Sequence, residues 1–406
     1  MSFQLYQDSY FQDLLDFKFD LFTNHDLVNI PDGSASSPGT SWRCLTRKNN
    51  GKKSEVMDLW SLLTQCAQSV AINVRRTANV LLEQISQHSS DTGDGTQRLA
   101  YYFANALKTR SAGLGAPSYL HLLSNKTSAA DKRQSRSTSL ISAFAMGSNG
   151  LALFDVSQQG LVDLPSFVLL EPSFPKQVFD LQKESKETGN RLKRFCERFN
   201  VPFEYIMIAK KWKTIWLEEL KINKGEVVVV NCMYRLKNLP DDTMASTSAR
   251  DTVLKLIRSI NPELFIHGIE SGMYNAPFFV TRFREALFHF SAKFNIFEAN
   301  VSREDPGRMM FEKEVLGRDV MNVIACEGSE RVERPETYKQ WQARTVTAGF
   351  KQVPWDQELV KKVSNLVQCN YHRDFGLDLD GHRMLPGWKG RVIYALSCWK
   401  PGSNDP

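Results

Sequence analysis

Apolar side chains recur at intervals of three and four residues between positions 54 and 115, which is the period of amphipathic α-helices. Gly113 and Gly115 close this stretch, as glycines often do after a helix. We therefore predict a helical unit whose apolar stripes must pack against other parts of the chain. The stripes are Leu59-Leu62-Leu63-Cys66-Ala67-Val70, Ala78-Leu81-Leu82-Ile85 and Leu99-Tyr102-Phe103-Ala106-Leu107.

Beyond residue 150 the pattern changes to short apolar runs separated by amphipathic segments, clearest at 191–199 and 249–260. This alternation indicates a parallel, doubly wound sheet. The predicted fold class is α/β, a mostly parallel sheet flanked by helices, with an N-terminal helical cap and a C-terminal antiparallel hairpin. Many methyl-transferring enzymes share such a shape. Predicted strands lie at 151–156, 166–171, 203–209, 226–234 and 263–270, later helices at 277–296, 310–325 and 335–350, and the hairpin near 374–386 and 391–399.

The first 53 residues differ in composition from the rest, and we predict a disordered segment there. Aspartates alternate with aromatic residues over 1–33, which is typical of activation segments that present aromatic side chains to a partner. A frayed helix that covers the domain is the alternative. A polar linker then leads to a basic cluster, which is either a nuclear import signal or a solvated linker. The cluster consists of Arg43, Arg47, Lys48, Lys52 and Lys53.

The composition of the 406 residues, 42% apolar and 24% charged, places the chain in the globular class. A net charge of +6 permits contact with nucleic acid without arguing strongly for it. Seven scattered cysteines without a CxxC motif indicate reduced thiols in the cytosol or nucleus. The start of the chain lacks a basic leader region, and no window holds 18 apolar residues. We therefore predict neither a secretory signal nor a membrane span.

The predicted strand at 151–156 is the place to test for a nucleotide cofactor, because such strands end in glycine-rich loops. The turn that follows it reads VSQQG, with bulky or polar residues in place of glycines, so a buried scaffold strand is preferred. Cys369 and His372 supply two ligands where a structural zinc needs four. His267 and His289 lie in apolar runs and fit packed core positions. The sequence thus predicts no catalytic residue, no cofactor and no metal.

Two segments in the C-terminal half combine basic and aromatic residues, 276–294 and 328–350. Ion pairs with nearby acids are the favoured interpretation, since runs of charge usually face water. A basic surface that contacts DNA is the alternative. The residues predicted for DNA contact are Arg282, Arg284, Arg331 and Arg344.

Leu59, Leu62 and Leu63 form an LxxLL face near the start of the helical unit. A partner's apolar groove would accept such a face, so these residues are candidates for partner binding. Burial of the same leucines in the core is the favoured alternative.

Together these segments resemble the plant GRAS-domain family, nearest its scarecrow-like branch. DLWSLLTQCAQSV and QRLAYYFANAL resemble its first leucine-rich region, and 261–294 resembles its PFYRE region. Arg318-Asp319 stands where the family usually has Arg-Glu, and Ser397-Cys398-Trp399 matches the SAW motif with cysteine in place of alanine. The likeness covers residues 54–401. The motif positions carried over are Pro262, Phe288, Phe290, Arg318, Arg331, Glu333, Arg334, Trp341, Trp388 and Trp399.

The resemblance implies a nuclear transcription regulator and not an enzyme, with a helical cap at 54–125 and a Rossmann-like, methyltransferase-like core at 150–401. It implies no cofactor, no membrane, a homo- or heterodimer, and other transcription regulators as partners. Some family members are credited with DNA contact through a basic groove. Three function classes stay open: a regulator that contacts proteins and DNA, a scaffold that does not touch DNA, and, least favoured, a small-molecule S-adenosylmethionine-dependent methyltransferase.

One region departs from the family pattern. Between 127–131 and 187–192 the family carries more chain, including a VHIID strand followed by a glycine-containing loop. Here the interval holds a polar run, DKRQSRSTS, and then the strand predicted at 151–156. We therefore expect a shortened or replaced portion of the sheet between 131 and 186. A short tail at 402–406 follows the predicted domain.

Overall fold

A computed structural model of the chain describes two compact units, each with its own core. The helical unit comprises residues 58–115 and 272–333, and the sheet unit comprises 334–402 and the described residues between 166 and 271. The segment 1–53 and the strand expected at 151–156 lie outside the described residues. The described residues are 58–115, 166–170, 193, 197, 204–208, 214–223, 225–240 and 248–402.

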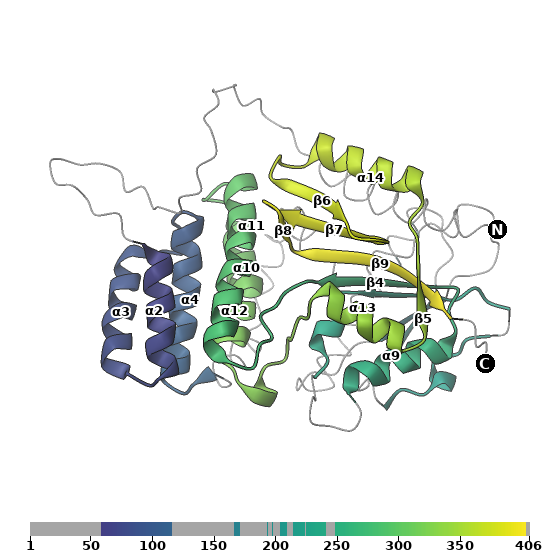
Figure 1. Cartoon of the computed structure of the whole chain (residues 1–406), viewed down its shortest axis with the longest axis horizontal. Coiled ribbons are helices and arrows are strands. Elements are labelled where there is room, and N and C mark those ends of the chain that lie inside the picture. The colour runs from purple at the N-terminus through teal and green to yellow at the C-terminus, as the bar shows by residue number, and fades with distance from the viewer. Residues whose placement is uncertain are drawn as a thin grey trace. The chain divides into compact units, whose positions relative to one another are not determined.

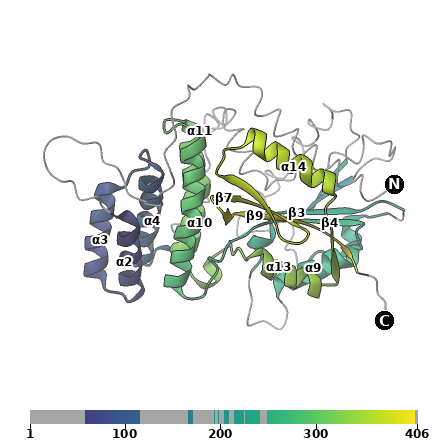
Figure 2. The same ribbon diagram turned by 45° about the horizontal axis from the view of Figure 1, so that its top comes forward.

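The helical unit begins with the three helices that the stripes predict, α2 (Leu59–Ala71), α3 (Arg75–His88) and α4 (Gly95–Ser111), which stand side by side in Figures 1 and 2. Asp58 caps α2 by accepting from the backbone N–H groups of Trp60 and Ser61. Asp94 and Gln97 form a reciprocal capping box on α4. The later elements are α10 (Phe279–Asn300), α11 (Pro306–Phe311), the π-helical turn η5 (Glu312–Leu316), α12 (Gly317–Ile324) and the short turn η6 (Gly328–Glu330).

The apolar stripes of α2–α4 pack on α10 and α12, which come from the second half of the sequence. Phe103 of α4 lies at the centre, with its ring 5.5 Å from that of Phe283 and 6.0 Å from that of Phe290, both at T-shaped angles. Edge-to-face pairs of this kind add to the stabilisation from burial. The cap residues 54–115 therefore share one core with the PFYRE-like segment.

The sheet unit is built on a seven-stranded sheet with the order β3-β4-β9-β7-β6, to which β5 and β8 add at β9 and β7. A separate pair, β1 (Ser166–Leu170) and β2 (Glu204–Ile208), runs parallel. The strands are β3 (Val229–Met233), β4 (Leu264–Glu270), β5 (Phe350–Val353), β6 (Phe375–Leu379), β7 (Arg383–Trp388), β8 (Arg391–Val392) and β9 (Tyr394–Pro401). The helices are α9 (Ala249–Ile260), α13 (Tyr338–Thr347) and α14 (Gln357–Asn370), with short turns η3 (Leu217–Leu220) and η4 (Leu236–Asn238).

Alternate residues of β4 point to opposite faces of this sheet. Phe265 and Ile269 pack in one cluster with α9 and α13, whereas Leu264 and Ile266 pack in another with α14. Figures 1 and 2 show α14 on one face of the sheet and α9 and α13 on the other. β4 is thus covered on both faces, and all of its residues are buried.

The expectation of a mostly parallel sheet is wrong for the seven-stranded sheet. Among its described pairings only β3–β4 is parallel, and β9 lies antiparallel to β4, β5 and β7. The reason is that, of the predicted parallel strands, only 226–234 and 263–270 join this sheet, as β3 and β4, whereas β1 and β2 form a separate pair. The C-terminal hairpin is present, with the first predicted run divided into β6 and β7 by a turn at Gly381.

Two elements were not expected from the sequence, β5 and α14. The helix predicted at 335–350 ends at Thr347, and Gly349, with φ +88°, turns the chain into β5. None of the described helices combines the length and the apolar content that a bilayer-spanning segment requires.

Candidate interaction surface

Arg282, the first residue predicted for DNA contact, is completely buried in the helical unit. Its guanidinium group donates to the carbonyl oxygens of Val323 (3.0 Å), Ala276 (3.1 Å) and Pro277 (3.3 Å) and pairs with Glu327. It therefore ties the start of α10 to the end of α12. This burial argues against DNA contact by Arg282 and agrees with the favoured interpretation of local ion pairs.

Arg331 and Arg344 are also held by the fold. Arg331 is 8% exposed in the helical unit. Arg344, in the sheet unit, donates to Glu336 through Nε (2.9 Å) and Nη2 (3.0 Å) and to Asp251 through Nη1 (3.1 Å). Three of the four predicted arginines, Arg282, Arg284 and Arg331, thus belong to the helical unit, and Arg344 belongs to the sheet unit.

Arg284 is the exposed member of the set, and no described carboxylate pairs with it. Phe288 lies one helical turn later and is 52% exposed, and its ring centroid is 6.5 Å from that of Trp60. This part of α10 therefore presents a cation beside aromatic side chains.

The LxxLL leucines belong to the core. Leu59 and Leu63 are buried, and Leu62 is half-buried against the same cluster. The structure therefore agrees with their interpretation as core residues. A partner could reach only the exposed part of Leu62.

The motif positions of the resemblance are mostly structural as well. Trp399 is buried and donates its indole N–H to Ser397 Oγ at 2.8 Å, and Trp341 lies 5.3 Å from the Arg250 guanidinium. Asn322, which sequence reasoning missed, accepts from the backbone N–H groups of Val332 (2.8 Å) and Glu333 (3.3 Å). Pro262, Phe290 and Trp388 are buried, Phe288 is exposed, and Arg318, Glu333 and Arg334 are half-buried.

The helical unit is hollowed where the turn between α2 and α3 meets the end of α4 and the segment 325–330. The depression has a volume of about 420 Å³, in the range of ligand pockets. Its lining is mixed in polarity, and we refer to it as the α3 depression. It is lined by Ser69, Val70, Asn73, Arg75, Ala78, Arg110, Ser111, Ala112, Gly113, Gly115, Ala325, Glu327 and Glu330.

Arg110 and Glu327 set the electrostatics of the α3 depression. Arg110 pairs with Glu327 at 2.6 Å, donates to the carbonyl of Ile324 at 3.1 Å and lies 3.8 Å from the ring centroid of Phe279. Burial acts to raise the pKa of Glu327, but the charges and hydrogen bonds of Arg282 and Arg110 outweigh it and hold that pKa below its ordinary value. Glu327 is therefore ionised and shared by two arginines.

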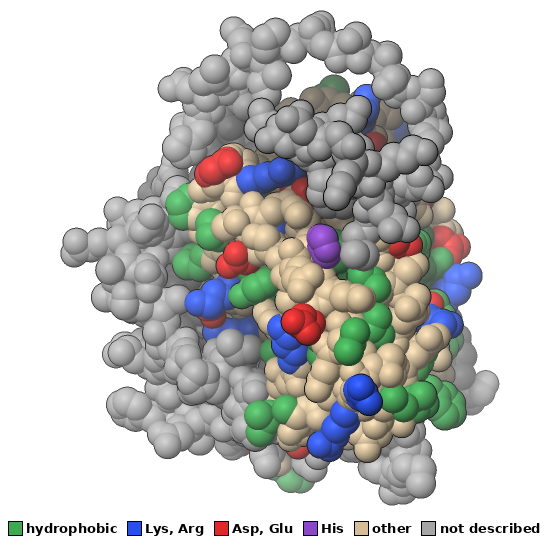
Figure 3. Space-filling model, turned by 90° about the vertical axis from the view of Figure 1, so that its left-hand side faces the viewer, with side chains coloured by type: hydrophobic (Ala, Val, Ile, Leu, Met, Phe, Trp, Pro, Cys, Tyr) green, Lys and Arg blue, Asp and Glu red, His purple; other side chains and the backbone are tan. Residues whose placement is uncertain are grey.

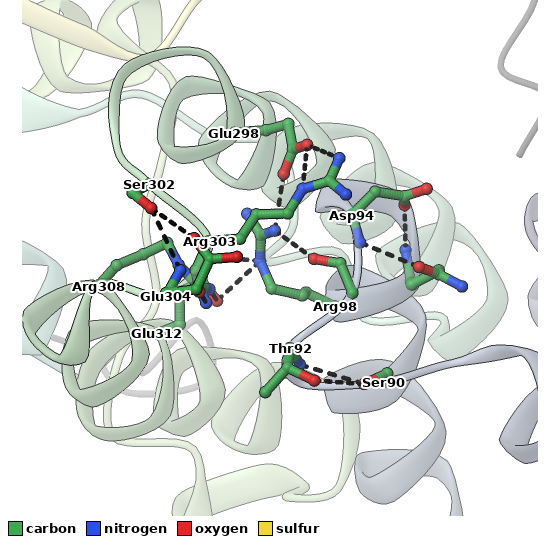
Figure 4. A network of polar contacts seen from close by, with 12 residues as sticks. Ser90, Thr92, Asp94, Arg98, Glu298, Ser302, Arg303, Glu304, Arg308 and Glu312 are labelled. Carbon is green, nitrogen blue, oxygen red and sulfur yellow. Dashed lines mark hydrogen bonds and ion pairs between the residues drawn. The ribbon is translucent and has the colours of Figure 1, made fainter. Parts of the chain in front are cut away.

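A second polar cluster of the helical unit was not found by sequence reasoning. Arg98 Nε lies 3.0 and 3.1 Å from the two carboxylate oxygens of Glu312, which also accepts from Arg308 (Figure 4). Arg98 Nη1 donates to Glu298 at 2.7 Å, and Arg303 pairs with the same carboxylate. The network joins α4, α10 and η5 inside the fold, so we assign it to stability.

Figure 3 shows the face of the helical unit on which α3 lies, and basic, acidic and apolar side chains are interspersed over the part that is described. No broad field of one charge covers that described part. Strongly exposed apolar side chains occur at Ile72, Val80 and Leu114. Mixed surfaces of this kind are suited to protein contacts more than to a phosphate backbone.

The model of the GRAS domain family matches residues 59–151 and 173–400. Scarecrow-like protein 14 of Arabidopsis thaliana is 46% identical over 390 residues, which cover 88% of this chain and 51% of the relative. Scarecrow-like protein 33 of the same plant is 47% identical over 385 residues, which cover 87% and 56%. This chain thus spans about half the length of these relatives. A solved structure, SCL7 from Oryza sativa, matches with a TM-score of 0.62 and 21% identity over 85% of this chain and 100% of that chain, which shows a shared fold.

Proposed function

The chain belongs to the GRAS domain family, and on that premise we propose that it is a nuclear transcription regulator that acts by binding other regulatory proteins, as a homo- or heterodimer. A further relative, 24% identical over 406 residues, is named Scarecrow-like transcription factor PAT1. The structural observation that supports protein contacts is the α3 depression with its exposed apolar rim. The proposal concerns the portion of the relatives' length that this chain covers.

Direct DNA contact is a second candidate function, and Arg284 is the observation that favours it. This arginine is exposed and lies beside Phe288 on α10. Cations neutralise phosphates, and aromatic side chains stack on bases. A single site of this kind gives a smaller contact than specific DNA readout uses, so protein binding is the preferred proposal.

For the core we propose a Rossmann-like arrangement without catalysis. The consecutive elements β3, α9 and β4 form a unit of two parallel strands joined through a helix, which such a core contains. The proposal of a non-enzyme is tested by titrating the protein with S-adenosylmethionine in a calorimeter. Heat of specific binding would favour the methyltransferase alternative.

The regulatory function is tested with the full chain in plant cells. A fluorescent fusion is expected in the nucleus, and fusion to a heterologous DNA-binding domain is expected to change expression of a matching reporter. Fluorescence titration with DNA at two salt concentrations separates the DNA-binding regulator from the scaffold, because phosphate contacts make affinity fall steeply with salt. Exclusion from the nucleus together with an unchanged reporter would contradict the proposal.

A further inference from the structure

Strand β6 forms an edge of the seven-stranded sheet, because among the described strands it pairs with β7 alone. Figure 1 shows it as the outermost strand on the side of α14. It is five residues long and runs antiparallel to residues 384–388 of β7. A sheet edge presents backbone N–H and C=O groups that a further strand can bind. The sheet of this protein can therefore be extended at β6.

The hydrogen bonds at the two ends of β6 determine which of its residues bond to β7. Lys389 donates its backbone N–H to the carbonyl oxygen of Asp374 at 2.7 Å. At the other end, Asp380 and Arg383 exchange two backbone hydrogen bonds of 3.2 Å. The residues of an antiparallel strand alternate between its two edges, so every second residue from 374 to 380 bonds to β7.

Leu377 and Leu379 occupy the intervening positions and direct their N–H and C=O groups away from β7. No group in the described part of the chain bonds to these backbone atoms. Leu379 is 53% exposed, and Leu377 is half-buried against the cluster that includes Leu359 of α14. Gly376 and Asp378 alternate with them and are exposed, and a Cβ at Gly376 would meet nothing within 4 Å. An added strand thus finds free backbone groups and open space.

Acidic side chains accompany this edge. Asp378 is exposed within β6, and no cation of the described ranges pairs with it. Asp374 and Asp380 flank the strand, and they pair with Lys389 at 3.5 Å and with Arg383 at 3.8 Å. Opposite charges across neighbouring strands stabilise a sheet, whereas like charges destabilise it. A strand that adds to β6 therefore needs a basic side chain opposite Asp378.

Two other occupants fit this edge less well. A nucleic acid is disfavoured because its phosphates carry the same charge as the carboxylates. A second copy is disfavoured because two antiparallel β6 strands centred on Leu377 would place their Asp378 side chains diagonally across from one another. Charged side chains on an edge strand oppose such pairing of identical sheets. The edge thus favours a different chain of opposite charge.

We propose that β6 binds an extended segment of another protein in which Lys or Arg alternates with apolar residues. The segment adds a strand to the sheet, accepting from the N–H groups of Leu377 and Leu379 and donating to their carbonyl oxygens. Its basic side chains lie on the face of Asp378, and its apolar side chains lie on the face of the two leucines. The inference rests on the proposed function and deepens it, since it names one surface and the chemistry of its partner.

Fluorescence polarisation of a labelled peptide with the full chain tests the proposal. The probe is a short peptide of alternating Lys and Val. One control alternates Glu and Val, and the other is the Lys-Val peptide N-methylated at each valine, which keeps the charge and removes the N–H groups that would face β6. The net charge of +6 on the protein disfavours non-specific attraction of a basic peptide. We expect both controls to bind at least about tenfold more weakly than the probe.

Variants of β6 assign the binding to its edge. Leu377→Pro removes one outward N–H and keeps the bonds between β6 and β7, since proline is tolerated where the N–H faces away from the sheet. Leu377→Ala is the matched control, because it shortens the side chain and keeps that N–H. We expect Leu377→Pro to weaken binding of the probe by about tenfold and Leu377→Ala by about twofold at most. Thermal melting establishes that each variant is folded.

Charge exchange at Asp378 decides the chemistry of the partner, and it does so even where Leu377→Pro does not fold. Asp378→Lys changes an exposed side chain and is expected to weaken binding of the Lys-Val peptide and to strengthen binding of the Glu-Val peptide. Hydrogen exchange at the amides of Leu377 and Leu379 is expected to slow when the wild type binds the probe.

Three results overturn the proposal: no binding of the probe to the wild type, equal binding of its N-methylated form, or an unchanged preference in Asp378→Lys. Self-association of the chain alone that Leu377→Ala retains and Leu377→Pro abolishes also overturns it, because a second copy then occupies the edge. Failure of the peptide to bind, together with a nuclear fusion that changes the reporter, rejects this inference and leaves the proposed function standing. Exclusion from the nucleus with an unchanged reporter rejects the proposed function instead.

Discussion

Arg98 and Glu312 form a fully buried ion pair across 214 residues of sequence, and it holds α4 against the π-helical turn η5. We expect Arg98→Met to lower the free energy of unfolding by about 3–5 kcal/mol, because the carboxylate of Glu312 would stay buried with one of its two arginine partners removed. The measurement is chemical denaturation followed by circular dichroism. Lys108→Met is the matched control, since Lys108 is exposed on the same helix, and its expected change is within about 0.5 kcal/mol. Equal stability of the two variants would contradict a stabilising role for the network.

Reversal of charge at two neighbouring arginines of α10 should have different consequences. Arg282→Glu places a second carboxylate beside Glu327 in a buried position, so we expect a clearly lower melting temperature. Arg284→Glu changes an exposed side chain and should leave the melting temperature unchanged. If the protein binds DNA, Arg284→Glu should weaken that binding, and an unchanged affinity would remove Arg284 from the DNA surface.

The LxxLL leucines can be separated by their burial. Leu63→Ala opens a cavity in the core of the helical unit and should lower the free energy of unfolding by about 2–5 kcal/mol. Leu62→Ala removes a half-buried side chain at the edge of that core and should lower it by less. Thermal melts of both variants provide the comparison. A stable Leu63→Ala protein that loses a partner would instead identify this face as a docking site.

Local patterns predicted the elements of this fold better than their pairing. The stripes of α2–α4 and the run of β4 follow from periodicity, because each helix and strand buries its own face. The antiparallel pairing of β9 with β4 does not follow from periodicity, because the sequence pattern of a strand covered on both faces is the same in either direction. The strand expected at 151–156 lies outside the described residues, so that prediction remains open.

Charged residues were harder to interpret than apolar ones. Arg98 and Arg282 sit in helices with other charged residues, and charge alone does not distinguish them from Arg284. Their partners are Glu312 and Glu327, which only the tertiary fold brings near. A basic residue in an amphipathic helix is therefore read correctly only when its position relative to the buried stripe is considered. Arg282 lies four residues before Ala286 and eight before Phe290, both of which are buried, and this helical spacing is the signal that was available.

Two glycines at the end of α4 should respond differently to alanine. A Cβ on Gly115 would lie 2.2 Å from the carbonyl oxygen of Ala325, so Gly115→Ala must push two backbone segments apart and is expected to cost about 1–3 kcal/mol. Gly113 has open space around it, and its cost comes from its φ of +70°, about 1–2 kcal/mol. Hydrogen exchange separates the two, since only Gly115→Ala should speed exchange at residues 325–330. Equal exchange there would mean that the lining yields without strain.

His267 should make the stability of the sheet unit depend on pH. Its ring stacks on Phe265 at 5.3 Å and meets Trp341 edge-on at 5.4 Å, and its Nε2 has no hydrogen-bond partner within the described part of the chain. Burial lowers the pKa of His267 to about 3, from 6.5 in an exposed histidine. Between these values the unfolded chain binds a proton that the folded chain does not, so stability falls as pH falls below about 6.5.

At pH values well below 6.5, this one histidine should lower the free energy of unfolding by about 1.4 kcal/mol for each pH unit. His267→Phe keeps an aromatic ring at the site and removes the titration, so its stability should fall less steeply between pH 6.5 and pH 4.5. Urea unfolding of both proteins at several pH values gives the two slopes, and their difference cancels the carboxylates that titrate in both. Parallel slopes would show that His267 titrates in the folded protein much as it does in the unfolded chain. A pKa lowered by burial would then be wrong.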